Sequence, residues 1–161
     1  MSTPHTYHLR RIEKDMPGRA DQLSVLRGQE YLSLALCHNG EPYLVSLNYV
    51  YDEAQNRFYV HSATEGRKVA CLRANPRVFG QVVENRGYIR GQCSQSYRSV
   101  MFWARAVFVD DQQEKRESLA AMIDRYEPDP APLKARLLAG DLSTVLVVRL
   151  DVESMSGKQG S

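Results

Sequence analysis

The sequence predicts a mainly β fold: a six-stranded antiparallel barrel with flanking helices, in a single domain spanning residues 1–161. Short segments rich in Val, Tyr, Phe and Leu recur along the chain and are separated by short polar turns, which is typical of antiparallel strands. A chain of 161 residues suits one hydrophobic core. Six such strands favour a barrel because closure removes the unpaired edges of the sheet.

The first half of the chain predicts one helix and three strands. Residues 1–14 are polar and are expected to pack loosely or fray. A helix is expected from about Asp15 to Gly28, because Asp can cap a helix and Gly can end one. An Asn-Gly pair at residues 39–40 signals a hairpin. The three strands that follow, joined by short turns, predict an antiparallel meander. They are expected at residues 31–37, 42–51 and 58–62.

The second half of the chain alternates helices and strands. Asn75-Pro76 ends a helix, and Asp111 with Glu114 three residues later resembles a capping box that opens another. A loop is expected over residues 85–97, which contain two glycines. The helices are expected at 65–74, from 111 to about 126 and at 133–139, and the strands at 77–84, 98–109 and 143–152.

Composition excludes several classes of protein. The formal net charge is +2, from 21 basic and 19 acidic residues that are interspersed, whereas a nucleic-acid binder gathers a basic excess on one face. The apolar runs are too short to span a bilayer, and no signal-peptide pattern opens the chain. Three scattered cysteines indicate neither a disulfide framework nor a metal site. We therefore expect a cytoplasmic protein that binds no nucleic acid, membrane or metal.

The strand over residues 43–49 has one face with polar groups. Alternation places Tyr43, Val45, Leu47 and Tyr49 on one face, where they can fill a core. The opposite face carries Leu44, Ser46, Asn48 and Val50, so hydrogen-bonding groups interrupt an otherwise apolar surface. A flat heteroaromatic ligand would use that combination. An edge strand with a solvated face explains the pattern equally, and the residues alone leave both interpretations open.

The most informative feature is the strand-to-helix junction at residues 61–68, HSATEGRK, hereafter the junction. Free N–H groups at a helix start attract anions, and Ser62 and Thr64 offer hydroxyl groups. Arg67 and Lys68 fall in the first turn, where the helix dipole disfavours cations by about 0.3–1 kcal/mol each. This local conflict indicates an anion site, because positions that break a local rule tend to be functional. An ordinary solvated Arg-Lys pair remains the alternative.

Three segments of the chain resemble a known family. They are PYLVSLNYVYDE, FYVHSATEGRKVACLRANPRV and YRSVMFWARAVFVDD, and the resemblance extends over roughly residues 10–158. They are similar to the pyridoxamine 5'-phosphate oxidase-like FMN-binding split barrels, and within them to the 5-nitroimidazole-resistance reductases and related flavin-nucleotide-binding proteins. The resemblance implies an FMN-binding split barrel that works as a homodimer, with FMN at the interface.

The resemblance also implies which residues hold the cofactor. It places the phosphate pair on Arg67 and Lys68, and a further flavin contact on Ser99. The ribityl and phosphate segment falls on His61 and Ser62, and His61 aligns with a histidine that has an active-site role in the nitroimidazole-resistance proteins. Trp103 is an interface, substrate-side or core residue. The flavin-contacting strand falls on Leu44, Val45, Ser46, Leu47, Asn48 and Tyr49.

The activity implied is that of an FMN-dependent oxidoreductase that takes electrons from NAD(P)H and reduces a small acceptor such as a nitro-aromatic compound. The basic and aromatic C-terminal residues that hold the vitamin in true pyridoxamine phosphate oxidases are not found, which puts vitamin B6 oxidation in doubt. A non-catalytic flavin-binding protein is one alternative. A haem-binding split barrel, with His61 or His38 as the iron ligand, is another.

Overall fold

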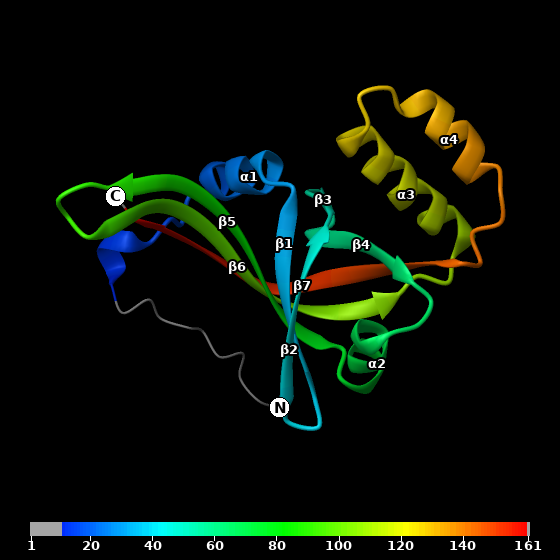
Figure 1. The fold of residues 1–161 in the computed structure, drawn as a ribbon, viewed down its shortest axis with the longest axis horizontal. Helices are drawn as coiled ribbons and strands as arrows, with labels where there is room; N and C mark the ends of the chain where they lie inside the picture. The colour runs from blue at the N-terminus through cyan, green and yellow to red at the C-terminus, as the bar shows by residue number, and fades with distance from the viewer. Residues whose placement is uncertain (1–10, 161) are drawn as a thin grey trace.

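A computed structural model of the protein describes residues 11–160, so the first ten residues, which fall in the segment expected to pack loosely, lie outside it. Most of the described chain forms one antiparallel sheet with helices around it (Figure 1). The elements are η1 (Ile12–Lys14), α1 (Arg19–Gly28), β1 (Tyr31–His38), β2 (Glu41–Asn48), β3 (Val50–Asp52), β4 (Arg57–Ala63), α2 (Arg67–Ala74), β5 (Arg77–Ile89), β6 (Ser94–Phe108), α3 (Gln112–Tyr126), α4 (Pro130–Leu138) and β7 (Val145–Gly160).

The described sheet has seven strands in the order β2-β1-β5-β6-β7-β4-β3, so the expectation of six strands was wrong by one. The difference arises at Tyr49, which separates β2 from β3. The Tyr49 N–H donates to the Tyr126 hydroxyl (3.1 Å), and that hydroxyl donates to the Tyr49 carbonyl (2.8 Å). Both backbone groups of Tyr49 are therefore bound to α3 instead of to a neighbouring strand, and the predicted strand 42–51 splits in two.

The split strand also closes the barrel. β2 pairs with β1 at one edge of the sheet, and β3 pairs with β4 at the other edge. Since one residue joins β2 to β3, the two edges of the sheet must curl toward each other. The predicted strand 42–51, which is β2 and β3, pairs antiparallel with β1 through its first part and with β4 through its last part, so the expected meander is confirmed. The break between β2 and β3 is the connection across which the barrel closes.

Two helices begin later than the sequence suggests. Asp15 does not cap α1: it pairs with Lys158 in an isolated β-bridge, and the neighbouring Met16 N–H donates to the Gly157 carbonyl. The helix starts at Arg19, after Gly18. Likewise α2 begins at Arg67, two residues after the expected start at Glu65, because Gly66 adopts φ 125°. This backbone conformation suits glycine and interrupts the helix.

The expected loop at residues 85–97 is mostly strand. β5 runs on to Ile89 and β6 starts at Ser94, so that a long hairpin projects from the barrel (Figure 1). The register shifts between Asn85 and Gly87, and such a bulge twists a strand without ending it. The two glycines that suggested a loop therefore mark a bulge and the hairpin turn.

The mostly aliphatic core of the barrel contains a group of three buried aromatic rings. The rings of Phe58 and Phe102 stack with centroids 4.3 Å apart, and Tyr49, which is fully buried, meets Phe58 edge-on. Gly80 lies against Phe102: a Cβ atom at this position would come within 2.1 Å of the ring. A side chain cannot fit there, so Gly80 allows the Phe102 ring to lie against the sheet.

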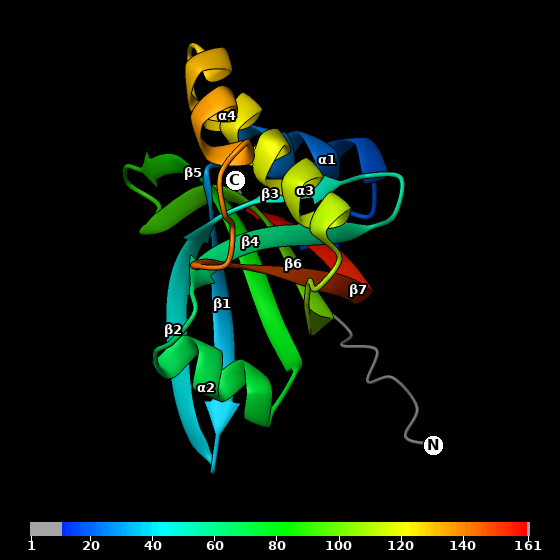
Figure 2. The ribbon, with the colours of Figure 1, turned by 90° about the vertical axis from the view of Figure 1, so that its right-hand side faces the viewer.

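The helices cover different parts of the barrel. In Figure 2, α3 and α4 lie together beside β3 and β4, whereas α2 lies near the far ends of β1 and β2. The Asp111 carboxylate accepts a hydrogen bond from the Glu114 N–H (2.7 Å), which confirms Asp111 as the cap of α3. The Glu114 side chain instead binds Tyr59 and Arg149. Within residues 11–160, no helix is long and apolar enough to cross a membrane.

Candidate functional site

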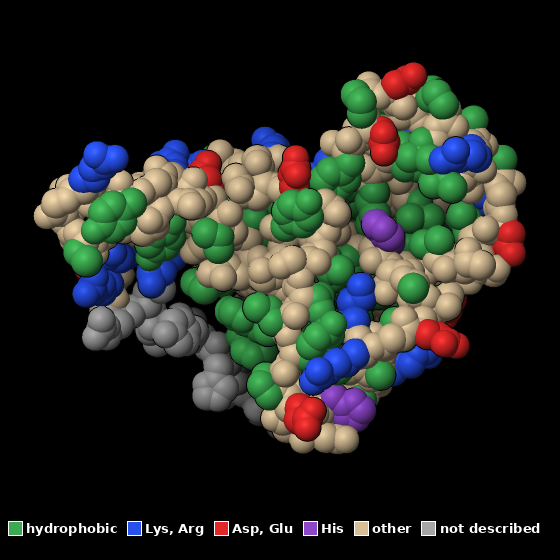
Figure 3. All heavy atoms as spheres, in the orientation of Figure 1, with side chains coloured by type: hydrophobic (Ala, Val, Ile, Leu, Met, Phe, Trp, Pro, Cys, Tyr) green, Lys and Arg blue, Asp and Glu red, His purple; other side chains and the backbone are tan. Residues whose placement is uncertain are grey.

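The junction places two cations at the start of a helix. β4 ends at Ala63 and α2 begins at Arg67, with Gly66 as its N-cap. The cap forms no side-chain hydrogen bond to the first turn, so the N–H groups there are open to another acceptor. In Figure 3, Lys and Arg side chains lie at the surface between β2 and α2, with hydrophobic side chains beside them. The junction therefore offers an anion both backbone N–H groups and positively charged side chains.

Lys68 carries a positive charge that its surroundings do not balance. Its side chain is half-buried, and burial lowers the pKa of its ammonium group. Among residues 11–160, no carboxylate forms an ion pair with Lys68. A half-buried ammonium without an anionic partner is unfavourable, and a bound anion would remove that cost. Lys68 is therefore the residue that most directly indicates an anionic ligand.

Arg67 has a partner, but a weak one. Its guanidinium lies 3.6 Å from the Glu41 carboxylate, and the two side chains are 59% and 79% exposed. The guanidinium also lies over the Tyr43 ring, 4.7 Å from its centroid. Exposed ion pairs contribute only about 0–1 kcal/mol. Arg67 can therefore exchange Glu41 for a phosphate group at little cost while it stays stacked on Tyr43.

His61 and Ser62 lie at the end of β4 nearest α2. They face Val147 and Leu146 of β7 in the sheet register. Ser62 is 9% exposed, and its hydroxyl has no hydrogen-bond partner among the described residues. The His61 side chain is largely exposed. Even so, the surrounding protein removes part of its hydration, and this desolvation together with the Lys68 charge lowers the pKa of His61. His61 is therefore uncharged at neutral pH.

The strand β2 presents the two faces that alternation predicts. Tyr43, Val45 and Leu47 pack on the core, and the fully buried Tyr49 donates its hydroxyl to the Leu26 carbonyl (2.7 Å). On the other face, Leu44 is 65% exposed and Ser46 is exposed.

These positions decide which β2 groups a ligand can reach. Tyr49 offers a ligand no free group, because its side chain is fully buried and both of its backbone groups are bound to Tyr126. Val45 and Leu47 are half-buried, with their side chains packed against the core. Asn48 is half-buried, and its amide donates to the Glu30 carbonyl (3.3 Å). β2 is an edge strand, so one side of its backbone is free to form hydrogen bonds.

Ser99 is not brought to the junction within one chain. It pairs with Lys158 near one end of β7, whereas Ser62 pairs with Leu146 near the other end. At about 3.3 Å per residue, the separation along β7 is on the order of 40 Å. Ser99 is 2% exposed, and its hydroxyl lies 3.5 Å from the Lys158 carbonyl. A contact between Ser99 and a ligand at the junction would require a second copy of the chain.

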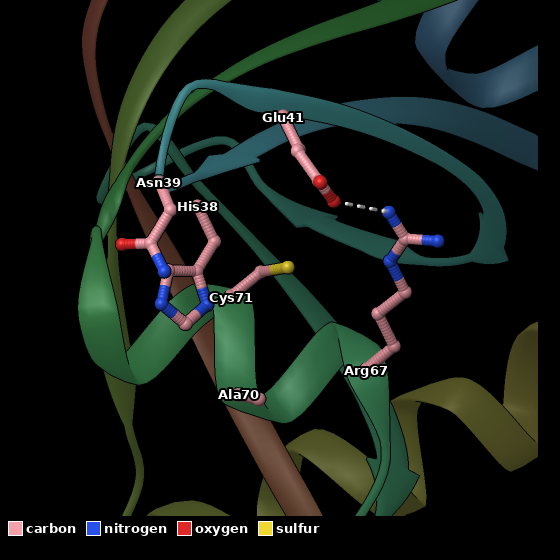
Figure 4. Close-up of a pocket in the computed structure, with 6 residues that line it drawn as sticks. All are labelled: His38, Asn39, Glu41, Arg67, Ala70 and Cys71. Carbon is pink, nitrogen blue, oxygen red and sulfur yellow. Dashed lines mark ion pairs between the residues drawn. The ribbon is translucent and has the colours of Figure 1, made fainter.

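A cavity beside the junction was not foreseen from the sequence. It lies between the β1–β2 hairpin and α2, has a volume of ≈ 180 Å³, and is hereafter the hairpin cavity (Figure 4). Its lining comes from segments about thirty residues apart, so no local pattern signals it. The Asn39-Gly40 turn predicts the hairpin but not its contact with α2. The lining residues are His38, Asn39, Glu41, Arg67, Ala70 and Cys71.

Comparison with known proteins identifies the family. The sequence model of the family described as pyridoxamine 5'-phosphate oxidase matches residues 18–159, and the chain belongs to this family. No curated protein sequence matches the chain.

Solved structures share its fold. One is a protein assigned to 5-nitroimidazole antibiotic resistance from Bacteroides thetaiotaomicron, with 23% identity, a TM-score of 0.72, and coverage of 96% of this chain and 95% of that one. An FAD-binding protein from Mesorhizobium loti has 28% identity, a TM-score of 0.63, and coverage of 89% and 96%. The FAD and haem binding protein from Mycobacterium smegmatis has 19% identity, a TM-score of 0.76, and coverage of 92% and 74%.

Proposed function

We propose that the protein binds a flavin nucleotide at the junction and uses it to pass electrons from NAD(P)H to a small acceptor such as a nitro-aromatic compound. The observation that carries the proposal is the uncompensated Lys68 charge at the start of α2, in the same short junction as Ser62, whose hydroxyl has no hydrogen-bond partner among the described residues. Membership of the pyridoxamine 5'-phosphate oxidase family and the FAD-binding relative from Mesorhizobium loti support a flavin as the anionic ligand.

Different residues of the site would bind the phosphate and the ring of the flavin. Lys68 and Arg67 would hold the 5'-phosphate, with the hydroxyl of Ser62 and the N–H groups of α2 as further donors. The exposed face and free edge of β2, with Leu44 and Ser46, would contact the ring. FMN is the smallest flavin that carries the required phosphate. The flavin supplies the redox chemistry, and the protein supplies binding and orientation.

His61 is the candidate for proton transfer. Its imidazole stands next to the proposed phosphate and ring positions and is uncharged at neutral pH, since burial and Lys68 lower its pKa. A neutral imidazole can both accept and donate a proton. We assign no nucleophile to the site, because electron transfer through a flavin requires none.

The phosphate site is tested by the double variant Arg67→Ala/Lys68→Ala. Hydrogen bonds to charged groups contribute about 1.5–3 kcal/mol each, so the dissociation constant for FMN should rise by about 100-fold or more. Titration of the protein with FMN, followed by flavin fluorescence, measures this. The control variant Arg86→Ala/Arg90→Ala makes the same charge change on the β5–β6 hairpin and should leave FMN binding unchanged. Equal FMN affinity in wild type and double variant would rule out this phosphate site.

Activity is tested by adding NADPH, or NADH, to the flavin-loaded protein without oxygen. Loss of the yellow flavin colour supports a reductase, and re-oxidation by a nitro-aromatic compound supports the acceptor class. Persistent colour with both donors indicates a non-catalytic flavin-binding protein.

Haem is the second candidate ligand. Both histidines in the described part of the chain lie at the site: His38 lines the hairpin cavity and His61 belongs to the junction. The structural relative from Mycobacterium smegmatis binds FAD and haem. Titration with haem distinguishes the candidates, because haem bound through histidine gives a shifted Soret band that His38→Ala or His61→Ala should abolish.

A further inference from the structure

The hairpin cavity contains a buried thiol. Cys71 is 3% exposed, and within residues 11–160 its sulfur forms no hydrogen bond and no disulfide. Figure 4 shows this sulfur directed into the space between the β1–β2 hairpin and α2. The other two cysteines, Cys37 and Cys93, are exposed and lie outside the lining of the cavity. The chain therefore has one thiol inside a cavity and two on its open surface.

Polar groups line the same cavity as this thiol. His38 and Asn39 come from the β1–β2 hairpin. Arg67 lies four residues before Cys71 on α2, so the two side chains share one face of the helix. The guanidinium is always charged and only donates hydrogen bonds, whereas an imidazole can accept a proton and return it. Arg67 and Glu41, at the border of the cavity, are largely exposed, so the cavity is open to solvent there.

We propose that Cys71 is a site of oxidation by small hydroperoxides, which convert its thiol to a sulfenic acid. With hydrogen peroxide, the thiol transfers its proton to the His38 imidazole and the sulfur attacks one peroxide oxygen. The sulfur–oxygen bond forms as the O–O bond breaks. The leaving oxygen takes the proton from His38 and departs as water, so that sulfur loses two electrons and the peroxide gains two. This reaction requires no bound flavin and is independent of the proposed function.

The cavity provides both selectivity and rate. Its volume of ≈ 180 Å³ admits hydrogen peroxide, a molecule little larger than water, whose share of liquid volume is about 30 Å³. The leaving oxygen becomes negative as the O–O bond breaks, and the Arg67 guanidinium and the Asn39 amide are donors that can stabilise this charge. An exposed thiol has only water for this purpose. Burial alone would make Cys71 the slowest cysteine to react, whereas the cavity should make it the fastest.

Oxidation of the reduced full-length protein by hydrogen peroxide tests the proposal within one chain. Dimedone traps sulfenic acids, and peptide mass spectrometry measures the trapped fraction at each cysteine. Cys71 should be trapped at least about tenfold faster than Cys37 or Cys93, because positioned donors and proton-transfer groups each accelerate reactions by about 100-fold or more. A maleimide attached to a polyethylene glycol chain should show the opposite order, since it is too large for the cavity. Slower or equal trapping of Cys71, or its rapid labelling by the bulky maleimide, would overturn the proposal.

Substitutions in the cavity lining test which groups act on the thiol. Arg67→Gln and His38→Gln should each slow the trapping of Cys71 by about tenfold or more and leave the exposed cysteines unchanged. Arg73→Gln makes the same change as Arg67→Gln at another exposed position of α2, outside the cavity lining, and should change none of the rates. Equal effects of the two arginine substitutions, or unchanged rates in both lining variants, would overturn the role of the cavity. Thermal unfolding followed by circular dichroism confirms that each variant folds.

Discussion

The ionisation of His61 and Lys68 depends on whether an anionic ligand is bound at the junction. Partial loss of hydration lowers the pKa of both side chains, and the Lys68 charge lowers that of His61 further. A phosphate bound beside them would reverse both effects, because it stabilises the two charged forms. The state of these two groups therefore reports whether the junction is occupied by an anion.

We predict that the pKa of His61 lies below its ordinary value of 6.5 in the ligand-free protein and rises when a flavin nucleotide binds. NMR titration of the histidine ring resonances measures it, with His61→Gln to assign the signal. Because the folded-state pKa is lowered, protonation of His61 favours the unfolded chain, so stability should decline as the pH falls through about 6.5. The decline should be smaller in His61→Gln. An unchanged pKa on flavin binding would place the phosphate elsewhere.

For single residues, the sequence predicted which side chains are charged or polar better than it predicted which other residues they contact. The Arg67-Lys68 pair and the polar face of β2 were recognisable because charge at a helix start and alternation in a strand are local properties. Glu41 and Tyr43, which hold Arg67, were not recognised as partners, since they contact it only after the hairpin packs on α2. Ser99 shows the same limit: its buried position on β6, opposite Lys158 near the far end of β7, has no local signal.

Among the elements, α3 links the outer layer to the barrel. Its cap, Asp111, holds the first turn, and the side chain of Glu114 from that turn binds Tyr59 and Arg149 in the sheet. Tyr126, at the other end of α3, binds both backbone groups of Tyr49. One helix therefore fixes the point at which the barrel strand divides into β2 and β3.

We predict that Asp111→Ala lowers the free energy of unfolding by about 1 kcal/mol, the usual cost of losing a helix cap. This corresponds to a decrease in Tm of about 2–4 °C for a chain of this size. Thermal unfolding measures the change. Asp110→Ala, an exposed neighbour outside the helix, is the control and should change Tm little. An equal effect of both substitutions would contradict the capping role of Asp111.

Several element boundaries departed from the sequence prediction for one physical reason: tertiary hydrogen bonds compete with local signals. Asp15 pairs with Lys158 of β7 instead of capping α1. The glycines at 87 and 91 are accommodated in a bulge and a turn because β5 and β6 continue to pair around them. Element type was predicted for most of the chain, but not for residues 85–97, where two glycines suggested a loop and the pairing of β5 with β6 makes a strand hairpin.

On the scale of the whole molecule, one face of the sheet is apolar but lies outside the core. Leu44, Ala35, Phe79 and Trp103 are directly opposite one another across β2, β1, β5 and β6. They share the face opposite to the core, and Figure 3 shows hydrophobic side chains at the surface beside β2. Val83, on the same face, is also exposed. An exposed apolar patch of this kind is typical of a protein interface, so we infer that this face joins two copies of the chain.

We predict that the wild-type protein is a homodimer in solution and that Ala35→Glu converts it to a monomer. A charge at this exposed position would meet its own copy across a two-fold axis, without a partner. Sedimentation equilibrium measures the mass, and Ala131→Glu, on the exposed surface of α4, is the control. If the flavin site includes the partner's surface, the loss of the dimer in Ala35→Glu should also lower the affinity for flavin. A monomeric wild type would refute the inferred interface.

The class of fold, the two faces of β2 and the cationic start of α2 could all be predicted from local sequence. Each depends on residues within a few positions of one another, where periodicity and chemical type act directly. The break at Tyr49, the distance between Ser99 and Ser62, and the position of the hairpin cavity beside Arg67 became visible only in the folded chain. These features arise where distant segments meet, because packing and hydrogen bonding between them determine which local tendencies prevail.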